Sequence, residues 1–211
     1  RTPYGSKSAK TIRQFTLQIG EFLKKNDVKM IVIACNTVSS TALELLRETY
    51  PDIPIVGCIT PTAKEVVKIC DKDSRIGIMA TKATVKSGVY EDKIKSLNEE
   101  LFIESIACPA LVPLIEEGII DNEIMDLTLK YYLDDFIREN DINTLILGCT
   151  HYPLISKNLK RLYPNIKIFS SSKEVATAVK MELEAADMLS QNENAKSIFY
   201  ASDLSENFVN M

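Results

Sequence analysis

Apolar positions in this chain fall into short runs and longer segments with helical spacing. The run MIVIA at 30–34 is short, apolar and rich in branched side chains, which is typical of a buried strand. In residues 8–25 the apolar side chains recur every three or four positions after a Ser-rich start, which predicts an amphipathic helix. The same patterns predict strands at 30–34, 53–57, 75–80, 101–107, 144–148, 165–169 and 197–201.

Helical segments separate these strands. Helices are predicted at 8–25, from caps at Ser39 and Ser40 to Thr49, and at 62–71, 84–97, 110–117, 122–139, 153–162 and 173–190. Strands that alternate with helices indicate an α/β fold with mainly parallel sheets covered on both faces. Pro54 favours an edge or terminal position for its strand, and the polar stretch 191–196 is predicted to be a linker.

The sequence contains an internal duplication. EFLKKNDVKMIVIACNT at 21–37 parallels DFIRENDINTLILGCTH at 135–151, with an offset of 114 residues. LRETYPDIPIV at 46–56 then parallels LKRLYPNIKIF at 159–169, with an offset of 113. Two matches in order at nearly one offset predict two pseudo-symmetric α/β domains with the active site in the cleft between them.

Composition excludes several classes of protein. Of 211 residues, 25 are Lys or Arg and 29 are Asp or Glu, so the formal net charge is −4 and no basic block suits nucleic acid or an anionic membrane. No apolar stretch approaches the ~20 residues of a membrane span. The five cysteines are widely spaced, without a C-x-x-C motif or a visible export signal, so we expect free thiols in a reducing cytoplasm.

Two cysteines occupy equivalent positions in the duplication. Cys35 and Cys149 each follow a predicted buried strand, at the end where open α/β sheets bind ligands. A small buried core residue is the plain alternative. However, the residue pairs that follow them, Asn36-Thr37 and Thr150-His151, are costly to bury unless they bind something, which favours a functional site.

Two thiols that face each other across a cleft can serve as base and acid on opposite faces of a stereocentre. A disulfide oxidoreductase would usually place its cysteines close together in sequence. A zinc site built on Cys149 and His151 lacks further ligands, so no metal is expected. His151 is either a hydrogen-bonded core imidazole or a group that polarises Cys149 or binds a carboxylate. Cys58, Cys70 and Cys108 are interpreted as structural.

Two further segments can contribute to the site. Tyr4 and Gly5, in PYG before the first helix, form a turn that could also line the cleft. Thr81 and Thr84, after the strand 75–80, could cap a helix or bind a carboxylate at its start. No G-x-G-x-x-G motif or P-loop supports nucleotide binding.

The motifs together resemble the cofactor-independent glutamate racemases of the aspartate/glutamate racemase superfamily. The segments that carry the resemblance are RTPYGSKS (1–8), IVIACNT (31–37), IGIMATKATVKSGVY (76–90), CPALVPLIEEG (108–118) and LILGCTHYPL (145–154). ACNT together with GCTHYPL is a specific pair. The resemblance implies a cytoplasmic homodimer that supplies D-glutamate for peptidoglycan without a cofactor.

The resemblance also assigns roles to residues. Cys35 becomes the acid/base thiol for D-glutamate and Cys149 the one for L-glutamate, with His151 beside it. Glu116 or its neighbour Glu117 matches an acidic position near the second thiol. The residues expected to hold the carboxylates and ammonium of the substrate are Tyr4, Gly5, Asn36, Thr37, Thr81, Thr84, Thr150 and His151.

The first domain is expected to comprise residues 1–74 and 171–211, and the second residues 75–170. The alternatives are a racemase of aspartate or another small acid, an inactive amino-acid-binding module, and a metal- or redox-linked thiol protein. The repeat and the resemblance also place a strand with an Asp-Ser-Gly motif about 38 residues before Arg1. We therefore expect residues 1–211 alone to be nearly inactive, poorly soluble and prone to association, and a version extended upstream by one strand and helix to racemise glutamate.

Overall fold

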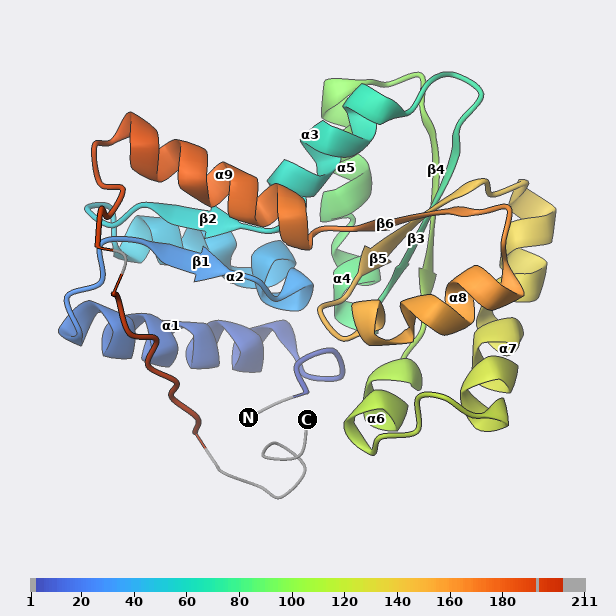
Figure 1. Ribbon diagram of the computed structural model, residues 1–211, viewed down its shortest axis with the longest axis horizontal. Helices are drawn as coiled ribbons and strands as arrows, with labels where there is room; N and C mark the ends of the chain where they lie inside the picture. The colour runs from blue at the N-terminus through green and yellow to red at the C-terminus, as the bar shows by residue number, and fades with distance from the viewer. Residues whose placement is uncertain (1–2, 193, 203–211) are drawn as a thin grey trace.

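The strands of the computed structural model form two parallel sheets with helices packed around them (Figure 1). The structure describes residues 3–192 and 194–202. The strands are β1 (Ile31–Ile33), β2 (Ile55–Gly57), β3 (Arg75–Ala80), β4 (Phe102–Ala107), β5 (Thr144–Gly148) and β6 (Lys167–Ser170). One sheet is β1-β2, the other has the order β4-β3-β5-β6, and every pairing is parallel, so the predicted fold class is confirmed.

Helices connect successive strands in both sheets. They are α1 (Ala9–Lys25), α2 (Asn36–Thr49), α3 (Ile59–Ile69), α4 (Lys82–Ser87), α5 (Val89–Leu97), α6 (Leu111–Glu116), α7 (Glu123–Asn140), the 3₁₀ turn η1 (Tyr152–Ile155), α8 (Ser156–Leu162) and α9 (Ser172–Ala185). Apart from those noted below, the predicted elements are confirmed to within a few residues at each end.

Three apolar clusters form the core. One joins α1 and α2 to β1 and β2, and it includes Ile12, Ile33 and Leu46. A second lies on the α6–α7–α8 side of the larger sheet. The third places α3, α5 and α9 against the other face of that sheet. Because α3 packs on the strands of the second predicted domain, these contacts do not mark a boundary at residue 74, and the domain ranges stay a prediction.

The duplication predicted from sequence is visible in backbone detail. Ile31 pairs with Ile55 across β1 and β2, and Leu145 pairs with Ile168 across β5 and β6, so the register repeats at the same offsets. Before each pair of strands, an aspartate leaves a helix in the left-handed region: Asp27 has φ 52° and Asp141 has φ 50°. The equivalence therefore extends from sequence to the way each helix ends.

Several predicted elements are wrong in detail. Ser39 and Ser40 do not cap α2; the helix begins at Asn36 with Cys35 as its N-cap residue, and the Ser39 hydroxyl donates to the Ile33 carbonyl. The predicted helix 84–97 is two helices, because Gly88 adopts φ 65° between α4 and α5. The helix predicted at 153–162 opens as the η1 turn.

The C-terminal prediction is also corrected. The helix predicted to reach residue 190 ends at Ala185, and Asp187 follows with φ 52°. Residues 197–201 form no strand, because their backbone pairs with no strand among the described residues. Ile198, Phe199 and Tyr200 lie exposed, and Tyr200 contacts the ring of Phe22 on α1.

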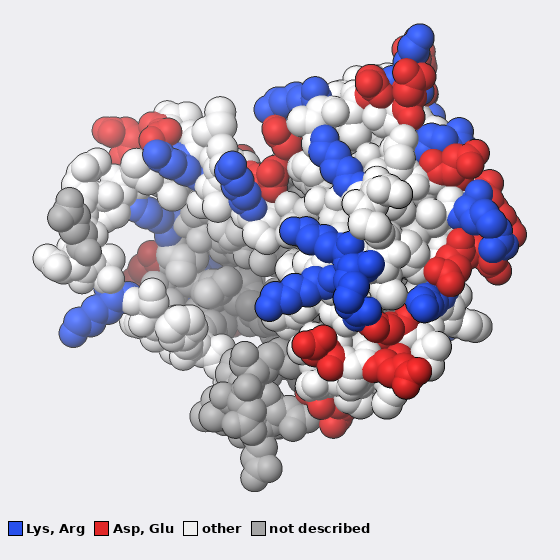
Figure 2. Space-filling model, turned by 45° about the vertical axis from the view of Figure 1, so that its right-hand side comes forward, with Lys and Arg blue, Asp and Glu red and all other residues white. Residues whose placement is uncertain are grey.

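Charged side chains of both signs intermingle on the face shown in Figure 2. In the part of the chain that the structure describes, no helix is long and apolar enough to cross a membrane.

Candidate active site

The predicted site residues lie just after three strands, one in the smaller sheet and two in the larger sheet. Cys35 follows β1 and is the N-cap residue of α2, Thr81 follows β3 and is the N-cap residue of α4, and Cys149 follows β5 directly. Within the larger sheet, β3 and β5 are parallel neighbours and present their carboxyl ends on one edge. The hydrogen bond between the Thr37 and Thr81 hydroxyls brings the end of β1 to the end of β3.

Cys35 lies at the amino end of α2. Burial raises the pKa of its thiol, whereas the backbone N–H groups of Val38 and Thr37 and the Thr37 hydroxyl act in the opposite direction. Free N–H groups and the helix dipole at this end favour negative charge. The helix therefore offsets part of the desolvation that opposes a Cys35 thiolate.

Three buried threonine hydroxyls connect the two halves of the molecule, which correspond to the two predicted domains: residues 75–170 form one half and the remaining described residues form the other. Thr37 Oγ1 lies 2.9 Å from Thr81 Oγ1 and 3.3 Å from Thr84 Oγ1, and the latter two are 3.1 Å apart. Thr81 also caps α4 by accepting the Thr84 N–H at 3.3 Å. The structure thus brings three predicted substrate-binding residues together.

Cys149 has a different set of neighbours. Its Sγ lies 3.7 Å from His151 Nδ1, and His151 Nε2 lies 3.1 Å from Glu116 Oε1. The geometry selects Glu116 rather than Glu117 as the carboxylate beside this imidazole. An oriented imidazole next to a thiol can assist proton transfer and contact an anionic substrate.

Burial dominates the ionisation of Cys149. It raises the pKa of this thiol to about 12, with the His151 backbone N–H acting against it. Negative charge on Cys35, Cys58 and Glu116 raises the pKa of Cys149 further. A negative charge on Cys35 therefore opposes the ionisation of Cys149.

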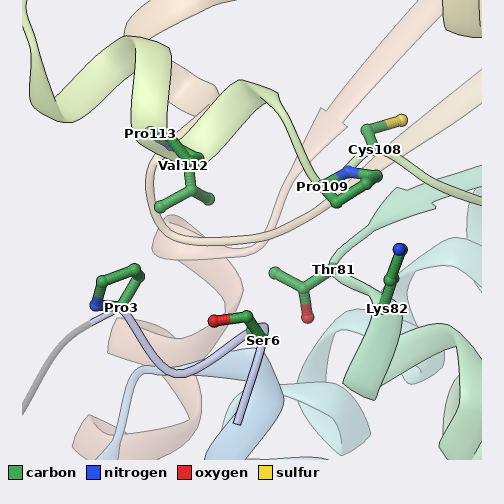
Figure 3. Close-up of a pocket in the computed structure, with 9 residues that line it drawn as sticks. Pro3, Ser6, Thr81, Lys82, Cys108, Pro109, Val112 and Pro113 are labelled. Carbon is green, nitrogen blue, oxygen red and sulfur yellow. The ribbon is translucent and has the colours of Figure 1, made fainter.

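The loop before α1 lies against β3. A Cβ atom at Gly5 would stand 2.7 Å from Thr81 Cβ and Cγ2, so only glycine allows this close approach. A cavity of about 120 Å³ opens here (Figure 3), lined by Pro3, Gly5, Ser6, Thr81, Lys82, Cys108, Pro109, Val112 and Pro113. Its lining includes two predicted site residues but neither Cys35 nor Cys149, and the Cys108 thiol points away from it.

The structure adds residues that sequence reasoning missed. Tyr90 on α5 donates from its hydroxyl to Asn36 Oδ1 at 2.6 Å, although it is 54 residues away in sequence. In the sequence, Tyr90 has the spacing of an ordinary aromatic core residue on an apolar helix face. The hydrophobic pattern therefore does not predict its contact with Asn36. Ser39 is the second such residue, because its hydroxyl accepts the Cys58 N–H and contacts the Cys58 thiol at 3.3 Å.

Other predicted residues stand apart from these contacts. Thr150 is exposed in the turn after Cys149. Tyr4 packs on the apolar cluster of α1 and β1, where its ring meets the edge of Phe15. Among the described residues, no three His, Cys, Asp or Glu side chains are grouped as metal ligands would be.

Known proteins resemble the chain over nearly all of its length. Residues 1–179 match the family model described as Asp/Glu/Hydantoin racemase. A glutamate racemase from Sulfurihydrogenibium sp. is 48% identical over 181 residues, which are 85% of this chain and 68% of that protein. One from Geobacter metallireducens is 38% identical over 211 residues, 99% of this chain and 77% of that protein.

A solved structure agrees with the sequence comparisons. Glutamate racemase from Francisella tularensis, crystallised in complex with D-glutamate, superposes with a TM-score of 0.93 at 33% identity, covering 100% of this chain and 78% of that one. The fold comparison and the sequence comparisons therefore point to the same family. The chain belongs to the Asp/Glu/hydantoin racemase family.

Proposed function

We propose that this protein interconverts L-glutamate and D-glutamate without a cofactor, with Cys35 and Cys149 as the two proton-transfer groups. The observation that carries the proposal is the equivalent placement of these two cysteines, each at the end of a strand in one copy of the duplication. The glutamate racemases to which the chain is similar support the choice of substrate.

The reaction requires one thiolate and one thiol. With D-glutamate, the Cys35 thiolate removes the proton from Cα, and the electron pair left on Cα delocalises into the adjacent carboxylate. The Cys149 thiol then donates its proton to the opposite face of Cα, which gives L-glutamate. The reverse reaction exchanges the roles, because Cys149 is then the thiolate and Cys35 the thiol.

Polar groups around the thiols suit a substrate with two carboxylates and one ammonium. Asn36, Thr37 and the linked hydroxyls of Thr81 and Thr84 offer donors on one side of the cleft. His151, held by Glu116, offers a donor on the Cys149 side. A substrate ammonium placed near both sulfurs would favour the thiolate against the burial that opposes it.

The decisive experiment follows exchange at Cα in deuterated water. D-glutamate and L-glutamate are incubated separately with the protein, both as residues 1–211 and as the upstream-extended version. Incorporation of deuterium with inversion supports racemisation, whereas glutamate binding without exchange would indicate a binding module. Exchange with aspartate alone would instead identify a racemase of the shorter acid.

The cellular setting follows from this activity. D-glutamate from the reaction would supply peptidoglycan synthesis, and the five free cysteines suit the reducing cytoplasm. We further propose a homodimer on the strength of the family resemblance. Sedimentation velocity at micromolar concentration tests it, and a single species with the mass of one chain would contradict it.

A further inference from the structure

The Asn36 side chain is buried, yet only half of it is satisfied. The residue is 2% exposed, and its Oδ1 accepts a hydrogen bond, but Nδ2 is buried with no partner in the structure. An unpaired buried amide donor is unfavourable, because it has lost its hydrogen bonds to water without gaining another. Since Asn36 directly follows Cys35, such a donor suits a substrate carboxylate oxygen close to the reacting carbon.

The orientation of this amide is set from the other half of the molecule. Tyr90 is 1% exposed, and its hydroxyl reaches Asn36 Oδ1 at 2.6 Å. Thr62 lies beside the same hydroxyl, but it donates its own proton to the Cys58 carbonyl at 2.7 Å. Burial keeps the pKa of Tyr90 well above its usual value, so the phenol remains a donor throughout the neutral range.

Resting on the proposed function, we infer that Tyr90 is a positioning residue that fixes the Asn36 amide so that Nδ2, and not Oδ1, faces the substrate carboxylate. With the amide reversed, a carbonyl oxygen would meet the carboxylate and repel it. Tyr90 thereby makes the recognition of substrate by one half depend on a helix of the other half. It does not touch the reacting atoms itself.

The test compares D-glutamate affinity, measured by calorimetry, with steady-state kinetics for Tyr90→Phe. We expect the dissociation constant and KM to rise about tenfold with kcat little changed, because losing one well-placed hydrogen bond weakens binding of substrate and transition state alike. Tyr50→Phe is the matched control. It also removes a phenol hydroxyl from a buried ring, because Tyr50 follows the last residue of α2 and donates to the Leu17 carbonyl on α1. This substitution should leave binding unchanged.

A double-mutant cycle separates positioning from a merely structural role. In an Asn36→Ala background, Tyr90→Phe should cause no further loss of D-glutamate affinity, because the amide on which it acts is absent. Additive losses would overturn the inference, as would wild-type affinity in Tyr90→Phe.

Asn36→Asp provides a test that does not depend on Tyr90. It keeps the acceptor that faces Tyr90 but replaces the Nδ2 donor with a charged oxygen, so D-glutamate should bind more weakly than to Asn36→Ala. Equal or tighter binding would overturn the inferred orientation. If the upstream-extended protein binds D-glutamate without turnover, only the proposed function fails; if it binds none, both fail.

Discussion

The two halves of the molecule place a cysteine in the same position and then surround it differently. On both sides, an aspartate in the left-handed region follows a helix, a strand comes next, and a cysteine comes after the strand. Even the caps of the next helices agree, since Tyr50 has φ −127° and ψ 67° and Tyr163 has φ −128° and ψ 64°. The two copies therefore share backbone geometry both before the strand that leads to each thiol and after the helix that follows it.

The chemistry around each thiol differs. Cys35 is the N-cap residue of a full α-helix, whose N–H groups lie around its sulfur. After Cys149 the chain turns through η1, with Pro153 in it, before α8 begins. An imidazole and a carboxylate, His151 and Glu116, take the place of the helix end on this side. One half thus relies on backbone dipoles and the other on ionisable side chains.

The largest effect is expected at the two cysteines themselves. Cys35→Ser and Cys149→Ser should each lower racemisation by about 10²–10⁴-fold, because a serine hydroxyl is far too weak an acid to replace a thiol. Racemisation assays and far-ultraviolet circular dichroism measure rate and fold separately. Near-normal turnover by either variant would rule out a two-thiol mechanism, and loss of folding would favour the core-cysteine interpretation.

The pH dependence of turnover tests whether the halves share one proton. Since catalysis needs one thiolate and one thiol, kcat/KM should follow a bell-shaped profile. Burial raises the pKa of both thiols, so the rising limb should lie on the alkaline side of the ordinary thiol value of about 8.5. A profile with a single ionisation would mean that only one thiol takes part in proton transfer.

Glu116 tests the part of the comparison that is particular to one half. Glu116→Gln should lower kcat/KM about tenfold in both directions, because it weakens a charge-assisted hydrogen bond to His151 worth about 1.5–3 kcal/mol. Both directions must change together, since the equilibrium constant of a racemisation is fixed. Glu117→Gln is the adjacent control, and a larger loss there would reassign the carboxylate.

Sequence patterns predicted the scaffold better than the contacts within the site. The duplication predicted where Cys35 and Cys149 lie, because strand ends and offsets are local properties of the chain. The periodic pattern does not predict the Tyr90–Asn36 hydrogen bond, since it joins an apolar helix face to the first residue of a helix distant in sequence. The apolar pattern does not predict the break at Gly88, because one glycine does not interrupt that pattern, although its φ of 65° separates two helices. The strand at 197–201 was predicted from β propensity alone, which cannot supply a pairing partner.

Two buried cysteines outside the proposed proton-transfer pair, one in each half, predict that the protein loses stability at alkaline pH. Burial raises the pKa of Cys58 to about 11 and that of Cys108 to about 12. A raised pKa means that the folded state holds its proton longer, so stability is full below pH about 8.5 and falls as pH rises towards 11–12. Denaturant unfolding at pH 8 and pH 10.5 measures this fall. Cys108→Ala should make it shallower, and an unchanged slope would mean that this thiol is accessible to solvent when folded.

The smallest effect is expected where the halves agree most closely. Asp27→Ala and Asp141→Ala should each lower the free energy of unfolding by about 1 kcal/mol, because alanine tolerates the left-handed region less well than aspartate does. The two losses should be equal and should leave kcat/KM unchanged. Asp135→Ala, at an exposed position on α7 with ordinary φ, serves as control and should change stability by less than about 0.5 kcal/mol. Unequal losses at Asp27 and Asp141 would show that the repeated backbone geometry carries different strain in the two halves, so that the resemblance between them is one of shape and not of energy.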